Sequence, residues 1–505
     1  MEEGVYWAYT TDDKINIGQK DFQIMDIKVI SVNVGKALLV SALFMFLSML
    51  VSIVNGMDAA FGPLAISFLI TFVVGAFPFI FVRKVPSITM TDGYLIIFIS
   101  WILSFIFGML PYVLYGGEFS LINSIFESVS GYTTTGFTVV EDVEALPKSL
   151  LFWRSSTHFI GGLGVIVFLL LVLPDASPFR LRMTNLELSS LSREGYRYRS
   201  SRTVWIISLV YLSIAVVETL LLWAAGMSLF DAINHAFSTV ATGGFSTRNA
   251  SIGYYNSRLI ELIVMFFMTL SAIHFGAIFT FFTTGSFKVF RNPVIIFYLL
   301  TIFAGTLFSG ADLFIRKTYP TVGQSLWEGA FHTISFITTT GFSIADPYKW
   351  PMFASVTLIY CGIQCGCSGS TTGGLKSDRI LIAFKAMGCE IKKRLHPNSV
   401  YSVHIGNHMV TDSAVNSVLM YFVVYAVLAT LAIFGFIASG LDGADATSTA
   451  IASIGNVGIS ALGSGNIGSM PLVSKLFCCF NMFLGRVEIY PVLIVFYLIF
   501  NRKAR

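Results

Sequence analysis

Charge is scarce in this sequence. Only 12% of its 505 residues are charged, whereas 55% are apolar, and the mean hydropathy is +0.76. A soluble protein of this length would need more charge to cover its surface, so that class is excluded. The apolar residues also occur in runs of about 20, which is the length of a helix that crosses a bilayer. The sequence therefore predicts an all-α polytopic membrane protein.

Motifs for covalent chemistry are missing as well. The chain has only 6 cysteines and 7 histidines, and no CxxC…CxxC pattern of the kind that binds metal. No HExxH or GxSxG motif is present, and the histidines of the apolar segments are scattered. An intramembrane enzyme would need a buried nucleophile and base or a metal cluster. We therefore expect neither an enzyme nor an organic cofactor.

Ten apolar segments are long enough to cross a bilayer. Because their number is even, both termini are expected on one side. Most Lys and Arg residues fall at the N-terminus, after every second span and at the C-terminus, and the positive-inside rule makes that side cytoplasmic. We predict a protein of the cell (inner) membrane with both termini in the cytoplasm. The predicted spans are 34–55, 63–82, 93–116, 147–174, 203–226, 256–284, 293–315, 351–385, 413–440 and 470–501.

A glycine-containing motif recurs after the third, fifth, seventh and ninth spans. Its four copies are YTTTGFT (132–138), VATGGFST (240–247), ITTTGFS (337–343) and IGNVGIS (454–460). They align on one glycine in each copy, and the copies lie about 100 residues apart, which indicates one structural unit used four times. The aligned glycines are Gly136, Gly244, Gly341 and Gly458.

A short helix is predicted before each copy of the motif. A residue that can cap a helix stands sixteen places before each aligned glycine: Ser120, Ser228, Ser325 and Asp442. A polar residue follows three places later, as in a capping box: Asn123, Asp231, Glu328 and Asp445. Helices of about 10–12 residues are too short to span a bilayer, so we expect them to enter from outside and stop partway.

These short helices would point their C-termini, which carry partial negative charge, at the membrane centre. Four such ends around one axis favour a cation. The Thr/Gly stretches beyond them can turn their carbonyls inward and replace the hydration shell of that cation. Each copy therefore predicts one quarter of an ion-selectivity filter. Ordinary external loops with turn glycines are the alternative, which the matched register of caps and glycines disfavours.

Four further segments resemble signature regions of the TrkH/KtrB potassium transporter family. They are FWRSSTHFIGGLGVIVF (152–168), SAIHFGAIF (271–279), CGCSGSTTGGLK (365–376) and LGRVEIYPVLIVF (484–496). The extra N-terminal pair of spans is more similar to the TrkH branch. The resemblance implies four membrane–pore–membrane repeats around a pseudo-four-fold central pore, and K⁺ as the transported ion. It also implies a homodimer and a cytosolic nucleotide-binding RCK regulatory subunit of the TrkA type, with no nucleic acid partner.

By this resemblance, each filter quarter is formed by the aligned glycine and the two residues before it. Glycine at all four aligned positions favours K⁺, although the fourth copy has no Thr before its aligned glycine. The predicted K⁺ site comprises Thr134, Thr135, Gly136, Thr242, Gly243, Gly244, Thr339, Thr340, Gly341, Asn456, Val457 and Gly458. The predicted units are an N-terminus (1–33), a two-helix unit (34–92) and repeats at 93–202, 203–292, 293–412 and 413–505.

A glycine-rich run interrupts the eighth span. Glycine at this density breaks a helix, and the freed backbone groups must face protein or a wet cavity. A mobile loop at 362–374, following the third filter stretch, is predicted to act as a gate, which the resemblance also implies. A small-xxx-small helix-packing site is the alternative. Arg486 in the tenth span needs a partner or water at that depth. The resemblance implies that it lies against this loop and binds its carbonyls, with a local pair to Glu488 as the alternative. The predicted gating residues are Gly366, Gly369, Gly373, Gly374, Lys376 and Arg486.

Several assignments stay open. A gated channel, an H⁺- or Na⁺-coupled symporter and a less selective cation channel all need the filter, and only a non-transporting sensor does not. His235 and His332 occupy the same place in two repeats and are expected to pack or hydrogen-bond behind the filter, with a metal-binding or proton-relay role as the alternative. Arg154 is expected either to snorkel or to pair with an acid near a short-helix start. The Arg-rich loop 175–202 suits anionic lipid headgroups or an acidic partner, or merely sets orientation.

Overall fold

The computed structural model describes residues 27–82, 90–172, 200–406, 408–463 and 467–500. Most of the predicted N-terminal unit 1–33 and most of the Arg-rich loop 175–202 lie outside the described residues. The regular structure is helical, apart from the antiparallel pair β1 (Val403–Ile405) and β2 (His408–Val410). The prediction of an all-α membrane fold is confirmed, and several apolar helices are long enough to span a bilayer.

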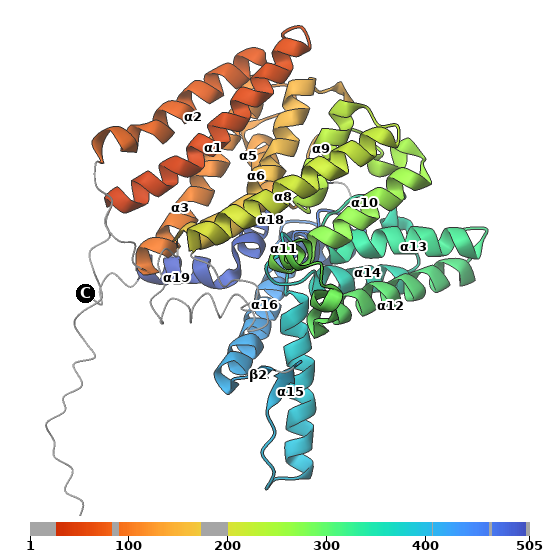
Figure 1. Cartoon of the computed structure of the whole chain (residues 1–505). Coiled ribbons are helices and arrows are strands. Elements are labelled where there is room, and N and C mark those ends of the chain that lie inside the picture. Colours follow the sequence, from red (N-terminus) through yellow and green to blue (C-terminus); the bar gives the residue numbers. More distant parts are fainter. Residues whose placement is uncertain (1–26, 83–89, 173–199, 407, 464–466, 501–505) are drawn as a thin grey trace, which may run out of the picture.

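The helices form an N-terminal pair, whose members lie side by side (Figure 1), and four sets. Each set contains a helix of 12–16 residues between its first and last helices. The pair is α1 (Ile27–Val54) and α2 (Phe61–Phe81). The first set is α3 (Met90–Gly108), α4 (Leu110–Tyr115), α5 (Leu121–Tyr132) and α6 (Lys148–Val172). The second is α8 (Ser200–Ala224), α9 (Leu229–Val240), α10 (Arg258–Ser271) and α11 (Phe275–Thr284). The third is α12 (Pro293–Ile315), α13 (Val322–Ile337), α14 (Met352–Gln364) and α15 (Ser377–Leu395). The fourth is α16 (Asp412–Ala438), α17 (Gly443–Ile454), α18 (Leu472–Val487) and α19 (Ile489–Phe500). Short 3-10 turns are η1 (Val143–Ala145), η3 (Ser251–Tyr255), η4 (Phe287–Arg291) and η5 (Pro347–Lys349).

Three predicted spans contain either a sharp bend or a long nonhelical stretch. The chain bends by 101° between α10 and α11, and by 109° between α18 and α19. His274 caps α11 by accepting the N–H of Ala277, so a new helix begins there. Glu488, with φ of +64°, separates α18 from α19. Pro491 in the first turn of α19 has no backbone N–H, so it cannot donate the hydrogen bond that a continuous helix would need there. In the eighth span the chain leaves the helix between Gln364 and Ser377.

The other boundaries differ by smaller amounts. Helix α1 begins at Ile27, seven residues before the predicted span, and the third span is divided between Gly108 and Leu110. A side chain on Gly108 would overlap the ring of Tyr132, so this glycine lets α3 approach the short helix α5 closely. The nonhelical segment of the third set is 365–376, not 362–374, because α14 continues through Gln364.

The long helices pack around the short ones and leave apolar outer faces. Helix α1 packs against α2, where a side chain on Gly35 would overlap the carbonyl of Gly75. Such small-residue contacts are typical of helix pairs in membranes. Large side chains on the outer face of α2, such as Leu69 (60% exposed) and Phe77 (57% exposed), are not covered by the described residues. An apolar outer surface of this kind suits lipid contact.

The predicted caps of the short helices are right in three repeats and wrong in one. Ser120, Ser228 and Asp442 each accept a backbone N–H at the start of α5, α9 and α17. In the third repeat the cap is Thr321, which accepts the N–H of Gln324. Helix α13 therefore begins one turn earlier, and Ser325 lies inside it with its hydroxyl bonded to the Thr321 carbonyl at 3.1 Å.

Candidate ion-conducting site

The short helices end in the same way in all four repeats. The residue two places before the aligned glycine donates its N–H to the carbonyl three residues back. The following residue donates to the carbonyl five residues back. These two bonds form a Schellman motif, in which the first of the two residues is left-handed. The left-handed residues are Thr134, Thr242, Thr339 and Asn456, with φ of 50°, 56°, 53° and 55°.

The aligned glycines join the four segments into a closed ring. All four have positive φ, between 74° and 88°. In each repeat, a Cβ added to this glycine would overlap the carbonyl oxygen that precedes the aligned glycine of the next repeat. Only glycine leaves room for so close an approach between backbones. The four contacts are Gly136 with Gly243, Gly244 with Thr340, Gly341 with Val457, and Gly458 with Thr135.

Hydroxyl and amide side chains brace the ring from the side. The hydroxyl of Thr135 lies 2.8 Å from that of Thr133, and Thr338 and Thr340 repeat this contact at 2.8 Å. Asn456 takes the place of a Thr in the fourth copy. Its amide donates to Thr135 Oγ1 at 2.9 Å and to the Met482 carbonyl at 2.8 Å. The fourth copy lacks these Thr residues, and the amide of Asn456 instead ties the fourth segment to the first.

Segment 365–376 lies directly against this ring. Its side chains are almost all buried. The hydroxyl of Thr371 donates to the carbonyl of Val240 at the end of α9 (3.1 Å), and the N–H of Gly373 donates to Thr339 Oγ1 (3.2 Å). A side chain on Gly373 would also meet the amide of Asn456. The segment therefore touches the second, third and fourth quarters of the ring at once.

The other predicted gating residues shape the same segment. A side chain on Gly366 would crowd the Ala272 carbonyl, and one on Gly369 would overlap the ring of His274. Gly374 has φ of +66° and lies against the thiol of Cys365. The ammonium of Lys376 donates to the carbonyl and to the hydroxyl of Thr372.

Arg486 ties the segment to two repeats. From α18, its Nη1 donates to the carbonyl of Thr371, and its Nη2 donates to the carbonyl of Gly161 on α6 at 2.9 Å. The side chain is only 4% exposed. Glu488, the alternative partner, instead pairs with Arg379 at 2.6 Å. The structure thus places Arg486 against the loop, and its part in gating stays a prediction.

Two supports of the loop were missed from the sequence. Asp378 accepts the N–H of Ser368 at 3.2 Å and its hydroxyl at 2.6 Å. The break between α10 and α11 frees the carbonyl of Ala272, which accepts the N–H of Cys367 at 2.9 Å. Ser368 lies in the nonhelical segment and Asp378 in the first turn of α15, ten residues later, so no periodic signal links them. The only local signal for the break is His274 as a helix cap.

Comparison with known proteins identifies the family of this fold. The family model described as TrkH, cation transport protein, matches residues 64–503. The chain belongs to the TrkH family. The Trk system potassium uptake protein TrkH of Escherichia coli (strain K12) is 33% identical over 410 residues, which cover 80% of this chain and 85% of that protein. The TrkH of Halomonas elongata is 36% identical over 417 residues, covering 82% and 86%.

A solved TrkH structure agrees with this assignment. The crystal structure of the potassium transporter TrkH from Vibrio parahaemolyticus is 30% identical in sequence, with a TM-score of 0.84. It covers 93% of this chain and 98% of its own. The predicted resemblance and fold are therefore confirmed. TrkH proteins are transporters, so the expectation of transport rather than catalysis is confirmed as well.

Ion pairs brace the start of the short helix α9 in the second repeat. Arg248 pairs with Asp231 at the start of α9 (2.9 Å) and with Glu144 of the first repeat (3.4 Å). Burial by itself raises the pKa of Asp231, but hydrogen bonds from Thr247 and Arg248 bring it below its ordinary value of 3.8. The carboxylate is therefore stabilised in its charged form in the folded protein.

Asp231→Asn is expected to lower the stability of the protein by about 1 kcal/mol at pH 7, because the ion pair is lost. A group with a lowered folded-state pKa stabilises fully above its ordinary pKa and loses that effect as the pH falls through the folded-state value. The difference between wild type and variant should therefore vanish in strong acid. Thermal unfolding in detergent measures it. Asp346→Asn, at an exposed pair with Lys349, is the control and should change little.

Proposed function

We propose that this chain carries K⁺ across the cell inner membrane into the cytoplasm through a filter formed by its four repeats. The closed ring of glycines and preceding carbonyls supports the proposal most strongly, because carbonyl rings can replace the hydration shell of a cation. The four short helices direct their negative ends at the same ring, which favours a cation further. The relatives described above are potassium uptake proteins by name.

The filter in this proposal consists of the twelve predicted residues. The aligned glycines are partly exposed, while the two residues before each of them are buried, so the ring faces an opening at its glycines. In each copy, both the aligned glycine and the residue two places before it have positive φ, which supports an inward turn of the carbonyls between them. K⁺ is the transported ion and not a resident cofactor.

The gate in this proposal is segment 365–376. It hydrogen-bonds to the second and third filter segments and lies close to Asn456 of the fourth, and Arg486 links it to α6 of the first repeat. A segment that lies across the ion path must move before ions pass. Its glycines permit that movement, since glycine adopts conformations that other residues avoid.

The proposed partners rest on the family likeness. They are a second copy of the chain and a cytosolic nucleotide-binding RCK subunit of the TrkA type, with both termini of the chain on the cytoplasmic side. Helix α15 extends away from the body of the protein (Figure 1) and carries three basic residues in its last turn. An exposed basic helix end is suited to contact with such a subunit or with anionic lipid headgroups.

Radioactive Rb⁺ uptake into proteoliposomes tests the proposed function. With the full chain reconstituted, we expect uptake that K⁺ inhibits and that Na⁺ and Li⁺ inhibit far less. Repeating the assay with an imposed H⁺ or Na⁺ gradient separates a channel from a coupled symporter, because only the symporter needs the gradient. Equal inhibition by K⁺ and Na⁺, or no uptake by well-folded protein under any gradient, would overturn the proposal.

A further inference from the structure

One position behind the filter differs in charge among the four repeats. It lies nine residues before each aligned glycine and is occupied by Glu127, His235, His332 and Thr449. Both histidines tie the short helix to the nonhelical chain that follows the filter. His235 bonds Ser246 Oγ at 2.9 Å, and His332 bonds the Ala345 carbonyl at 3.2 Å. In the first repeat the same position holds a carboxylate.

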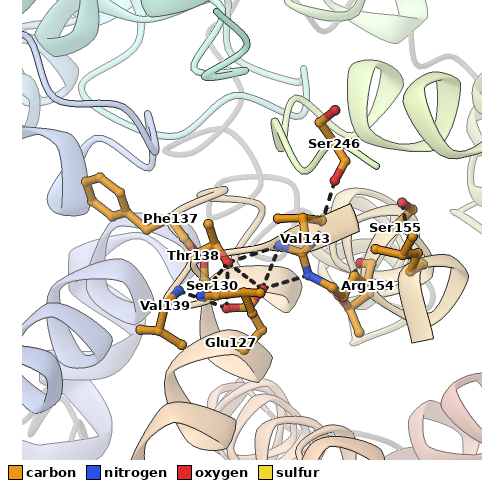
Figure 2. Close-up of polar contacts among 12 residues, drawn as sticks. Glu127, Ser130, Phe137, Thr138, Val139, Val143, Arg154, Ser155 and Ser246 are labelled. Carbon is orange, nitrogen blue, oxygen red and sulfur yellow. Dashed lines mark hydrogen bonds and ion pairs between the residues drawn. The ribbon is translucent and has the colours of Figure 1, made fainter. Parts of the chain in front are cut away.

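The Glu127 carboxylate binds the extended chain that follows the first filter segment (Figure 2). It accepts hydrogen bonds from the hydroxyl of Thr138 at 3.0 Å and from the N–H of Val139 at 3.2 Å. It also pairs with Arg154 of α6, with the closest N–O distance at 2.7 Å. Glu127 is 0% exposed and Arg154 is 2% exposed, so both charges lie away from water.

Arg154 extends this contact to the second repeat. Its Nη2 donates to Thr138 Oγ1 at 3.1 Å, and its Nη1 donates to the carbonyl of Ser246 at 3.4 Å (Figure 2). Thr138 and Ser246 each stand two residues after an aligned glycine. The guanidinium also lies 4.2 Å from the ring centre of Phe245, which stacks on His158 at 4.1 Å. The guanidinium of Arg154 therefore contacts both chain segments that follow the close contact of Gly136 with Gly243.

A buried ion pair contributes little net stability, because removing two charges from water offsets their attraction. What this pair supplies is fixed geometry, since a guanidinium donates in a rigid planar fork. We propose that Glu127 and Arg154 are positioning residues that hold the first and second filter segments at a set distance and thereby determine the preference for K⁺ over Na⁺. This inference rests on the proposed filter function.

The test compares K⁺ and Na⁺ as inhibitors of Rb⁺ uptake in three variants of the full chain. Glu127→Gln keeps the shape of the side chain but removes its charge. Arg154→Lys keeps the charge, but a lysine cannot reach both filter segments. Thr138→Val removes one shared hydroxyl and leaves both charges paired, so it covers the case in which the first two variants do not fold. Glu261→Gln is the matched control. Its carboxylate is also buried (5% exposed), but its partners Arg258 and Trp327 lie outside the filter.

We expect the K⁺ over Na⁺ preference to fall by about tenfold in Glu127→Gln and Arg154→Lys, since hydrogen bonds to charged groups are the stronger ones. A smaller fall is expected in Thr138→Val, and none in Glu261→Gln. Thermal unfolding is measured in parallel. Lower stability with an unchanged preference in the folded variants would show a merely structural pair and overturn the inference. A wild type without K⁺ preference would instead overturn the proposed function.

Discussion

Gly136→Ser is expected to reduce the preference for K⁺ over Na⁺ by about tenfold to a hundredfold. A non-glycine residue at its φ of +88° costs about 1–3 kcal/mol. The new Cβ would also overlap the carbonyl oxygen of Gly243, so either the first or the second filter segment must shift. Since about 1.4 kcal/mol is a factor of ten, a shift confined to the filter is enough to change the ranking of two similar ions. Competition of Na⁺ and K⁺ for Rb⁺ uptake measures the change.

Gly440→Ser separates strain from contact. Gly440 also has positive φ (+100°), but a Cβ added to it would meet nothing within 4 Å. This variant should therefore lose some stability and keep the wild-type ion preference. If both serine variants left the preference intact in folded protein, the ring of glycines would not be the selective element. If both altered it, backbone strain alone would account for the effect.

Arg486→Gln is expected to raise the rate of Rb⁺ uptake by about tenfold. The guanidinium holds the carbonyls of Thr371 and Gly161 together, and a hydrogen bond to a charged group is worth about 1.5–3 kcal/mol. Without it, segment 365–376 keeps its contacts to the ring but loses its link to α6, so its open arrangement becomes more populated. Initial uptake rates at equal protein density measure this change.

Two further variants make the gate prediction sharper. Deletion of residues 368–372 removes Thr371 itself and should raise uptake even if Arg486→Gln fails to fold. Arg258→Gln changes an arginine that pairs with Glu261 and donates to no loop carbonyl, so its uptake should match wild type. Unchanged or slower uptake in both the deletion and Arg486→Gln, with folded protein, would contradict a gate in this segment.

Local patterns predicted the elements of the site well. Ser120, Ser228 and Asp442 cap their helices as expected, because capping depends on residues within one turn. The third cap was wrong since Thr321 and Ser325 are both suitable caps one turn apart. A local pattern cannot rank them, and the earlier cap adds a turn of hydrogen bonds to α13.

Contacts between repeats could not be predicted from the sequence. Arg154 reaches Ser246, Asn456 reaches Thr135, and the partners of both are far away in the chain. Arg154 was expected to snorkel or to pair with an acid near a short-helix start, and it pairs with Glu127 in the middle of α5. The bends at His274 and Glu488 were likewise missed, because hydropathy measures apolar length and not direction.

The four segments of the ring belong to one polypeptide, which has a consequence for how the proposed ion selectivity can change. In a pore assembled from four identical chains, one codon alters every quarter simultaneously. Here Gly458 meets Thr135 within a single polypeptide, so each quarter is encoded separately. A mutation then perturbs one quarter and leaves three intact. Under the proposed function, ion preference can therefore change in small increments. The fourth quarter, which Asn456 braces with its amide, already differs from the others.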